Sequence, residues 1–297
     1  MTTRTDADDV ADVARFETMA HQVGGHSTAK TSLKAHGGKV LKPFQNHRRG
    51  EREHEFYERV FRDPHAPAIY ERLRPLVPGY HGVVVVADGA DEHRNGKHLV
   101  MDDLTWGRRW PCIMDVKVGT RSYEDGASAE KIAYEKQKFP LQERVGFRIQ
   151  GIKAFVPMTR AYVEFDKHFG RQVQSPEALT PAFAHFFSTL EGDMRKRTVL
   201  LKALETWFAE QQELEFVASS LLFLYNGEAD SNVAATAGDS EAALALALAL
   251  APDIRLIDFA HVAQRSPDAR QVDAGVLTGI RTITRCFAEL LAQQSLA

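Results

Sequence analysis

The sequence has few cysteines, no long hydrophobic run and no excess of positive charge, and each shortage excludes a class of protein. Its two cysteines, Cys112 and Cys286, lie far apart in apolar surroundings, which argues against a disulfide framework and a cysteine-based zinc site. The longest apolar run, residues 242–251, is too short to cross a bilayer. The formal net charge of −3 argues against a polybasic nucleic-acid-binding protein.

The N-terminal stretch lacks the apolar core of a secretory signal, because residues 1–13 are polar and acidic. We therefore expect an intracellular protein, in the cytoplasm, the nucleus or both, with no membrane insertion and no nucleic-acid partner. A chain of 297 residues is long enough for one large domain or two packed lobes. Any site for an anion must then be a local basic patch.

The stretch from Cys112 to Val118 alternates as a short strand with two different faces does. Asp115 and Lys117 lie on one face, and apolar side chains form the other. An acid and a base side by side on a strand suit a polyanionic, metal-bound ligand. The alternative is an edge strand with a solvated ion pair, which would contribute little to stability.

The first half of the chain predicts strands over residues 39–44, 83–87 and 98–101 and a helix over 51–61. Glu53 or Glu55 of this helix could pair with Lys42, as a strand lysine and a helix glutamate do in protein kinases; the alternative is a solvated acidic face. A polar link follows the strand that ends at Met101, and such a link is typical of a hinge whose backbone binds adenine.

Residues 21–31 are close to a phosphate-binding P-loop, with Gly24, Lys30 and Thr31 in place. Ala29, however, stands where that motif needs its second glycine. The other interpretation is a glycine-rich turn between two strands, which could cover phosphates as the lid of a kinase-like lobe does.

The second half predicts a helix from Ser128 to Lys138, on which Lys131, Glu135 and Lys138 share one face. That face is either a phosphate-binding surface or a solvated charged one. Further predicted elements are a strand over 146–156, a loop over 166–170, helices over 181–190, 194–212, 241–251 and 275–296, and strands over 215–225 and 254–261. Asp258, near the end of the last strand, resembles the magnesium-binding aspartate of kinases.

Three motifs in order resemble the signatures of the inositol polyphosphate kinase family. Residues 111–119 (PCIMDVKVG) are similar to its PxxxDxKxG signature, 219–222 to its SSLL motif and 257–261 (IDFAH) to its IDF motif. The stretches HQVGGH, LKPFQ and RGEREHEFYERV are similar to the multikinase branch of that family. The resemblance extends from about residue 20 to the end of the chain.

This resemblance implies an α+β, two-lobed kinase-like fold of the ATP-grasp and protein-kinase type. Antiparallel sheets are expected in both lobes, with an added helical inositol-phosphate-binding segment over 128–138. The implied division is a flexible tail over 1–18, an N-terminal lobe with ATP lid and hinge over 19–105, and a C-terminal lobe over 106–297.

The resemblance also implies a role for each residue that matches a family motif. For ATP these are Lys42 on the phosphates, the backbone of Asp102 and Leu104 on adenine, and Asp115 on the ribose, with Asp258 as the Mg²⁺ ligand. Lys117 is implied beside the transferred phosphate and His261 beside the inositol hydroxyls, so that Asp115, Lys117 and His261 form the catalytic set.

The implied contacts to the substrate's phosphates come from Lys131 and Lys138, with Arg121 as a further candidate. The sequence departs from the multikinases here, because Tyr134 and Glu135 stand where that branch has a pair of glutamines. Glu135 would repel a nearby phosphate unless its carboxylate turns to a lysine.

The expected activity is transfer of the ATP γ-phosphate to hydroxyls of soluble inositol tris- and tetrakisphosphates, by a monomer that uses ATP and Mg²⁺. Three alternatives stay open. They are an inositol hexakisphosphate kinase that makes inositol pyrophosphates, a non-catalytic inositol-phosphate-binding or protein-binding scaffold, and a P-loop NTPase.

Overall fold

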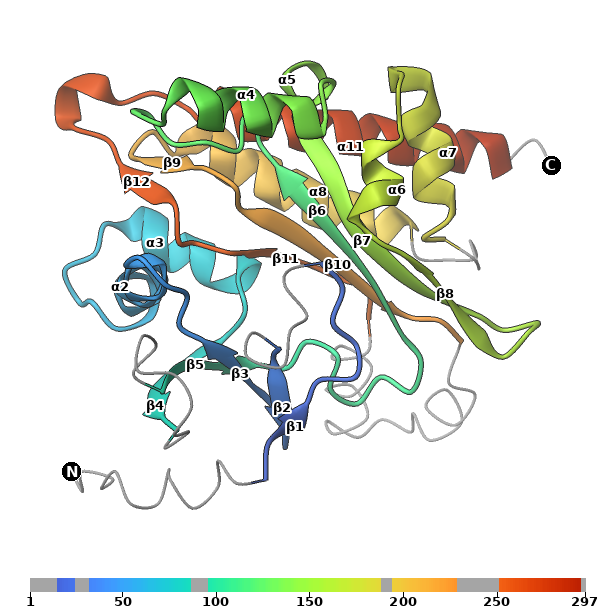
Figure 1. Ribbon diagram of the computed structural model, residues 1–297, viewed down its shortest axis with the longest axis horizontal. Helices are drawn as coiled ribbons and strands as arrows, with labels where there is room; N and C mark the ends of the chain where they lie inside the picture. The colour runs from blue at the N-terminus through green and yellow to red at the C-terminus, as the bar shows by residue number, and fades with distance from the viewer. Residues whose placement is uncertain (1–14, 25–31, 87–95, 188–193, 229–250, 295–297) are drawn as a thin grey trace.

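The computed structural model contains two five-stranded antiparallel sheets with helices beside each of them (Figure 1). The structure describes residues 15–24, 32–86, 96–187, 194–228 and 251–294. The predicted helix over 241–251 and most of the predicted turn over 88–97 lie outside these residues. The architecture is α+β with antiparallel sheets in two lobes, as predicted.

The first sheet has the strand order β1-β2-β3-β5-β4. Its strands are β1 (Glu17–Thr18), β2 (Lys34–His36), β3 (Lys39–Pro43), β4 (Tyr80–Val85) and β5 (Lys97–Asp102). Beside it lie α2 (Arg49–Phe61), α3 (Ala68–Leu73) and the 3₁₀ turn η1 (Arg74–Leu76). Glu17 and Thr18, at the end of the stretch predicted as a flexible tail, pair with β2, and a strand of two residues has no periodic signal in the sequence.

The second sheet has the order β11-β10-β6-β7-β8 and therefore places the acid-and-base strand at its centre. Its strands are β6 (Pro111–Val118), β7 (Phe147–Val156), β8 (Ala161–Phe165), β10 (Ser220–Asn226) and β11 (Asp253–Ile257). Because β6 pairs with β10 on one side and β7 on the other, the edge-strand alternative is wrong.

Two predicted segments differ from the structure, and short-range backbone geometry explains both. The predicted strand over 215–225 is broken into β9 (Leu214–Phe216) and β10, since Ala218 adopts a left-handed φ of 59°. β9 pairs instead with β12 (Val262–Gln264). The predicted loop over 166–170 is mostly the helix α6 (Lys167–Arg171), which Asp166 caps by accepting a hydrogen bond from the His168 N–H.

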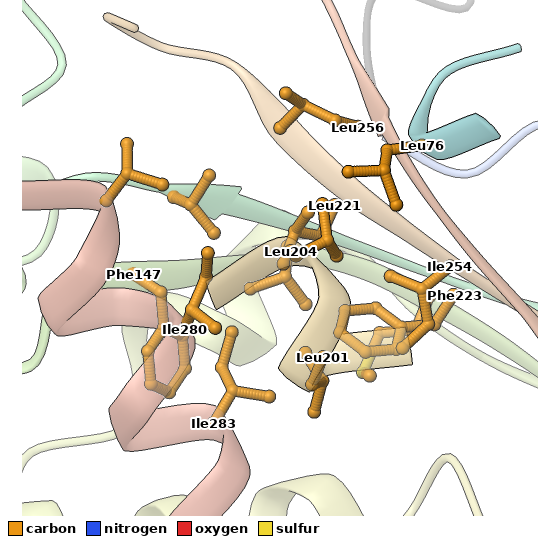
Figure 2. Close-up of a cluster of buried hydrophobic side chains, with 14 of the residues drawn as sticks. Leu76, Phe147, Leu201, Leu204, Leu221, Phe223, Ile254, Leu256, Ile280 and Ile283 are labelled. Carbon is orange, nitrogen blue, oxygen red and sulfur yellow. The ribbon is translucent and has the colours of Figure 1, made fainter. Parts of the chain in front are cut away.

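One face of the second sheet is covered by helices that bury the main apolar core. These helices are α7 (Leu179–Ala184), α8 (Met194–Glu210) and α11 (Ala274–Gln294). Figure 2 shows the side chains of α8 and α11 meeting those of β10 and β11, among them Leu204, Ile280, Leu221 and Leu256, each with 0% exposure. Each such side chain contributes about 1.5–3 kcal/mol through burial, and together they hold the sheet that carries Asp115.

At one end of this sheet lie two more helices, α4 (Ala129–Lys138) and α5 (Gln142–Val145) (Figure 1). Ser128 caps α4 by accepting a hydrogen bond from the Lys131 N–H, which fixes the start predicted from the sequence. Two further 3₁₀ turns are η2 (Pro176–Ala178) and η3 (Pro267–Ala269). Among the described helices, none combines the length and apolar character that a membrane span needs.

Candidate active site in the cleft between the two sheets

A cavity of about 370 Å³ lies between the two sheets and takes its walls from both. Its apolar walls come from Leu33, Val40, Met101, Ile113, Leu222 and Ile257. Its lining also includes all five predicted cofactor-binding positions, Lys42, Asp102, Leu104, Asp115 and Asp258, four of which carry a charged side chain. The cavity thus joins an apolar slot to a group of charges, which suits a ligand with a flat ring at one end and anionic groups at the other.

Lys42 is held between two carboxylates. Its Nζ atom lies 2.8 Å from Glu53 Oε1 and 2.6 Å from Asp258 Oδ1. Burial alone would lower the pKa of Lys42, but the charges of Asp258 and Glu53 outweigh it and raise that pKa. Of the two glutamates that the sequence left open, Glu53 is the partner, while Glu55 is exposed to solvent.

Asp258 is fixed through its own backbone as well as its side chain. Its φ of 66° is left-handed, which is uncommon for a residue other than glycine. Ser219 Oγ donates to the Asp258 carbonyl at 2.7 Å, and the next N–H, that of Phe259, donates to Glu53 Oε1 at 3.2 Å. Such strained positions persist where surrounding bonds determine them, and they are common at functional sites.

Asp115 and Lys117 share the cleft face of β6, as the alternation predicted. Lys117 Nζ donates to the Ala218 carbonyl at 2.8 Å, at the left-handed residue that separates β9 from β10. Asp115 is 6% exposed, and its Oδ1 atom has no hydrogen-bond partner among the described residues. A buried acceptor without a partner indicates a ligand or water at this point.

The charges of this group shift one another's pKa values. Burial, and then the charge of Asp258, raise the pKa of Asp115 to about 7, against the opposing effect of Lys117. Burial lowers the pKa of Lys117 despite the two carboxylates. Burial would raise the pKa of Asp258, but Lys42 and Lys117 hold it below its usual value. Two nearby acids whose pKa values are shifted in opposite directions are typical of functional sites.

Gly24 brings the N-terminal segment against the floor of the cleft. Its φ is +71°, and a Cβ atom at this position would lie 2.3 Å from Asp115 Oδ2. Only a residue without a side chain allows the backbone to approach the carboxylate this closely. The rest of the glycine-rich segment, residues 25–31, lies outside the described residues, so the choice between P-loop and lid is not tested there.

The predicted hinge residues lie at the rim of the cavity with several of their polar groups already bonded. The Asp102 N–H donates to the Gly79 carbonyl at 2.9 Å, and its Oδ1 atom binds His81 Nε2 at 2.6 Å. The Leu104 carbonyl accepts a hydrogen bond from Arg108 Nε at 3.1 Å. The link after β5 is therefore a well-bonded turn beside the apolar slot.

The lysines of α4 face the same way, as their spacing predicted. Lys131 Nζ and Lys138 Nζ lie 2.6 and 2.8 Å from the same atom, Glu135 Oε1. Lys136 points elsewhere and pairs with Glu143. The Glu135 carboxylate thus turns to the lysines, which is the orientation in which we expected it not to repel a nearby phosphate.

None of the five predicted substrate residues, which are Lys117, Arg121, Lys131, Lys138 and His261, lines the 370 Å³ cavity. Arg121 is paired with Asp125 and, at 2.6 Å, with Glu215, and it lines a separate hollow of about 190 Å³. The structure therefore does not bring Arg121 into the cleft. His261 Nδ1 lies 3.2 Å from Glu124 Oε1.

Two charged residues that the sequence did not single out, Arg52 and Glu124, lie beside His261. Arg52 of α2 pairs with Glu124 at 2.8 Å, and Glu124 in turn faces His261. Arg52 is part of the stretch RGEREHEFYERV that carried the resemblance, so a signal existed for it. Glu124 lies in a polar connection before α4, where no pattern marks it.

The donor set fits a divalent cation whose shell is completed by ligands from outside the protein. Among the residues that the structure describes, no group of three or more His, Cys, Asp or Glu is arranged to hold a metal alone. Asp258 offers a carboxylate that is 37% exposed on the cleft, and Asp115 has a buried oxygen without a partner. Mg²⁺ is typically bound by one or two carboxylates with phosphates and water completing its shell.

Comparisons with known proteins identify relatives of this chain. The model of the family "Inositol polyphosphate kinase" matches residues 98–288. Inositol polyphosphate multikinase of Rattus norvegicus is 36% identical over 216 residues, which are 70% of this chain and 53% of that protein. Inositol polyphosphate multikinase beta of Arabidopsis thaliana is 29% identical over 264 residues, with 82% and 83% covered. The chain thus spans about half the length of the mammalian relatives that it matches.

Among solved structures, the chain is similar to inositol phosphate multikinase Ipk2 of S. cerevisiae in complex with ADP and Mn²⁺. The TM-score is 0.64 at 24% sequence identity, with 86% of this chain and 100% of that chain covered. This likeness establishes the kinase-like fold that the sequence predicted. Because the family model matches more than half of the residues, the chain belongs to the inositol polyphosphate kinase family.

Proposed function

We propose that the chain is an ATP-dependent inositol polyphosphate kinase of the multikinase type, which phosphorylates hydroxyls of inositol tris- and tetrakisphosphates. The observation that carries the proposal is the convergence of Lys42, Asp115 and Asp258 at one cavity, with Lys117 near enough for the charges of both acids to act on it. Membership of the family supports the reaction class. The names of the relatives from rat and Arabidopsis support the multikinase type.

The nucleotide would occupy the 370 Å³ cavity, with adenine in the apolar slot near Leu104. Asp115 would accept a hydrogen bond from the ribose, for which its partnerless Oδ1 atom is suited. Lys42 would lie against the phosphates. It is already oriented by Glu53, so little reorganisation is needed when the nucleotide binds.

Asp258 would hold a divalent cation, Mg²⁺, which when bound would neutralise charge on the nucleotide phosphates. The ADP and Mn²⁺ of the yeast relative's structure support a nucleotide and a divalent metal in this family. Asp258 is suited to the task because Lys42 and Lys117 keep its pKa low, so that it stays ionised.

Lys117 would stabilise the negative charge of the phosphoryl group during transfer. Its Nζ atom is fixed by the Ala218 carbonyl and lies in a poorly solvated position, where a cation interacts strongly with developing charge. His261 would orient the acceptor hydroxyl. With Nδ1 directed at Glu124, its Nε2 atom is left to accept the hydroxyl proton.

Lys131 and Lys138 of α4 would bind phosphates of the acceptor, and Arg121 remains a candidate only if it leaves Glu215 and Asp125. The acceptor would therefore lie between α4 and His261. This arrangement keeps the reacting hydroxyl near Lys117 while the phosphates that are not transferred stay on the helix.

The decisive experiment is an ATP-consumption assay with a panel of inositol phosphates, whose products are resolved by chromatography. We expect phosphorylation of tris- and tetrakisphosphates, and turnover lower by about 10²–10³-fold with Asp258→Asn. Pyrophosphate products from the hexakisphosphate would indicate a hexakisphosphate kinase instead. Tight binding of inositol phosphates without any ATP consumption would indicate a scaffold.

A further inference from the structure

The two lysines of α4 are already neutralised in part by a buried carboxylate of the same helix. Glu135 is 7% exposed, and one of its oxygens, Oε1, accepts from both Lys131 and Lys138. Burial alone would raise the pKa of Glu135, but these two bonds hold it below its usual value. Glu135 therefore stays ionised and occupies the place between the two ammonium groups.

A third cation, on the strand β7, is influenced by the charge of this carboxylate. Arg148 of β7 stands opposite Lys117 of β6 and is 3% exposed. Its Nε and Nη1 atoms have no hydrogen-bond partner within the described part of the chain. Burial lowers the pKa of Arg148, and Glu135 supplies the largest opposing charge, followed by Asp115.

Glu135 is therefore the anion that two ammonium groups of α4 share, and its charge also acts on Arg148 of β7. Buried guanidinium nitrogens are normally bonded, and an Arg148 with two unbonded ones indicates that an acceptor is missing from the group.

We propose that Glu135 is a specificity-determining residue, whose carboxylate stands in for a phosphate between Lys131 and Lys138 and disfavours acceptors with a phosphate at that position. This inference rests on the proposed function and names a limit on its substrates. An acceptor phosphate must either displace the carboxylate from the lysines or share them with it. Both cost binding free energy, because like charges are brought together at a buried position.

The aromatic neighbour of Glu135 strengthens this arrangement. The Tyr134 ring lies 4.2 Å from Lys138 Nζ and 5.7 Å from Lys131 Nζ, while its side chain remains 58% exposed. A cation–π contact keeps both ammonium groups close to the helix surface. The lysines are thus held beside Glu135 rather than extended freely into solvent.

The test is the isosteric variant Glu135→Gln, with Glu143→Gln as matched control. Glu143 of α5 pairs with Lys136 of α4 at 2.6 Å, and its side chain is 57% exposed. It forms no ion pair with Lys131 or Lys138. Affinities for inositol trisphosphate and inositol hexakisphosphate are measured by calorimetry at fixed salt. We expect Glu135→Gln to tighten hexakisphosphate binding about tenfold and trisphosphate binding by less than threefold. Glu143→Gln should change neither.

Kinetics separate specificity from a structural role. For the trisphosphate, Glu135→Gln should keep kcat within about twofold while the inhibition constant of the hexakisphosphate falls. Glu135→Asp, which withdraws the carboxylate by one methylene, should lower the inhibition constant of the hexakisphosphate relative to the KM of the trisphosphate as well, but by less. If active variants keep the wild-type ratio of these two constants, or bind both ligands more weakly, Glu135 does not determine specificity, although the proposed function would still hold. Failure of the wild-type chain to bind or phosphorylate either ligand would overturn the proposed function, and this inference with it.

Discussion

Lys42 and Asp258 are 216 positions apart in the chain, yet Lys42 Nζ and Asp258 Oδ1 are 2.6 Å apart. The pair connects β3 of the first sheet to the residue that follows β11 of the second. Because Glu53 binds both Lys42 and the N–H of Phe259, the link is doubled. One ammonium group therefore connects the two sheets and orients the carboxylate that is proposed to hold the metal.

The first prediction concerns Lys42→Met, which leaves the carboxylate of Glu53, with 1% exposure, without its cation. Breaking a buried pair from one side costs about 3–5 kcal/mol, and we expect a loss of this size in the free energy of unfolding. ATP-dependent phosphorylation should be lost as well. Urea denaturation and the kinase assay measure the two effects separately.

The double variant Lys42→Met/Glu53→Gln is the control for this prediction. It removes the unpaired charge and should recover part of the lost stability, but none of the activity. A Lys42→Met protein as stable as wild type would contradict the role of the ammonium between the sheets.

The second prediction concerns Asp258→Asn, which removes the charge proposed to hold the metal but preserves shape. Asparagine tolerates the left-handed backbone found here, with φ of 66°, so the variant should fold. We expect turnover to fall by about 10²–10³-fold, the usual effect of losing one electrostatic contact to a transition state. Steady-state kinetics with Mg²⁺ measure it, and full activity would remove Asp258 from the proposed site.

Comparison with Asp258→Ala separates backbone strain from chemistry. Alanine should be equally inactive but less stable than asparagine, by about 1 kcal/mol, because it lacks the side chain that eases a left-handed conformation. Thermal unfolding of the two variants measures this difference directly.

The sequence predicted those parts of the site that lie on regular elements. Alternation placed Asp115 and Lys117 on one strand face, and helical spacing placed Lys131 and Lys138 together, because both patterns depend on local geometry alone. It could not show that β6 is central, since pairing with β7 and β10 involves distant segments. It also could not choose Glu53 over Glu55, because the docking of α2 decides which of them faces Lys42.

The remaining differences come from features that have no periodic signal. Ala218 and Asp258 adopt left-handed conformations without being glycine, and tertiary bonds to each, rather than propensity, account for them. α6 has only five residues, too few for a helical pattern. Arg121 matched the expected region, but Asp125 and Glu215 of β9 hold it in a different hollow.

The third prediction concerns the pH dependence of stability in the nucleotide-free protein. The pKa of Asp115 is raised to about 7 from an ordinary value of 3.8, so the folded state binds a proton that the unfolded state has released between these values. Stability that is present at pH 4 should therefore fall as the pH rises to 7, by up to about 4 kcal/mol. Denaturation at several pH values measures it.

Asp115→Asn provides the comparison for this titration. The variant cannot ionise at this position, so its stability should lack the fall between pH 4 and 7, and above pH 7 it should exceed that of wild type. Parallel curves for the two proteins would show that Asp115 does not titrate in this window.

The fourth prediction uses two glycines with left-handed backbones, one beside the site and one away from it. Gly24→Ala places a Cβ atom 2.3 Å from Asp115 Oδ2, whereas Gly37→Ala, at φ +55°, has no atom within 4 Å of the new methyl group. Both variants should lose about 1–2 kcal/mol of stability from backbone strain. Only Gly24→Ala should also displace Asp115 and weaken ADP binding, by about tenfold. Calorimetric titration with ADP distinguishes them, and an equal loss of affinity in Gly37→Ala would mean that strain in the first sheet, rather than the approach of Gly24 to Asp115, governs nucleotide binding.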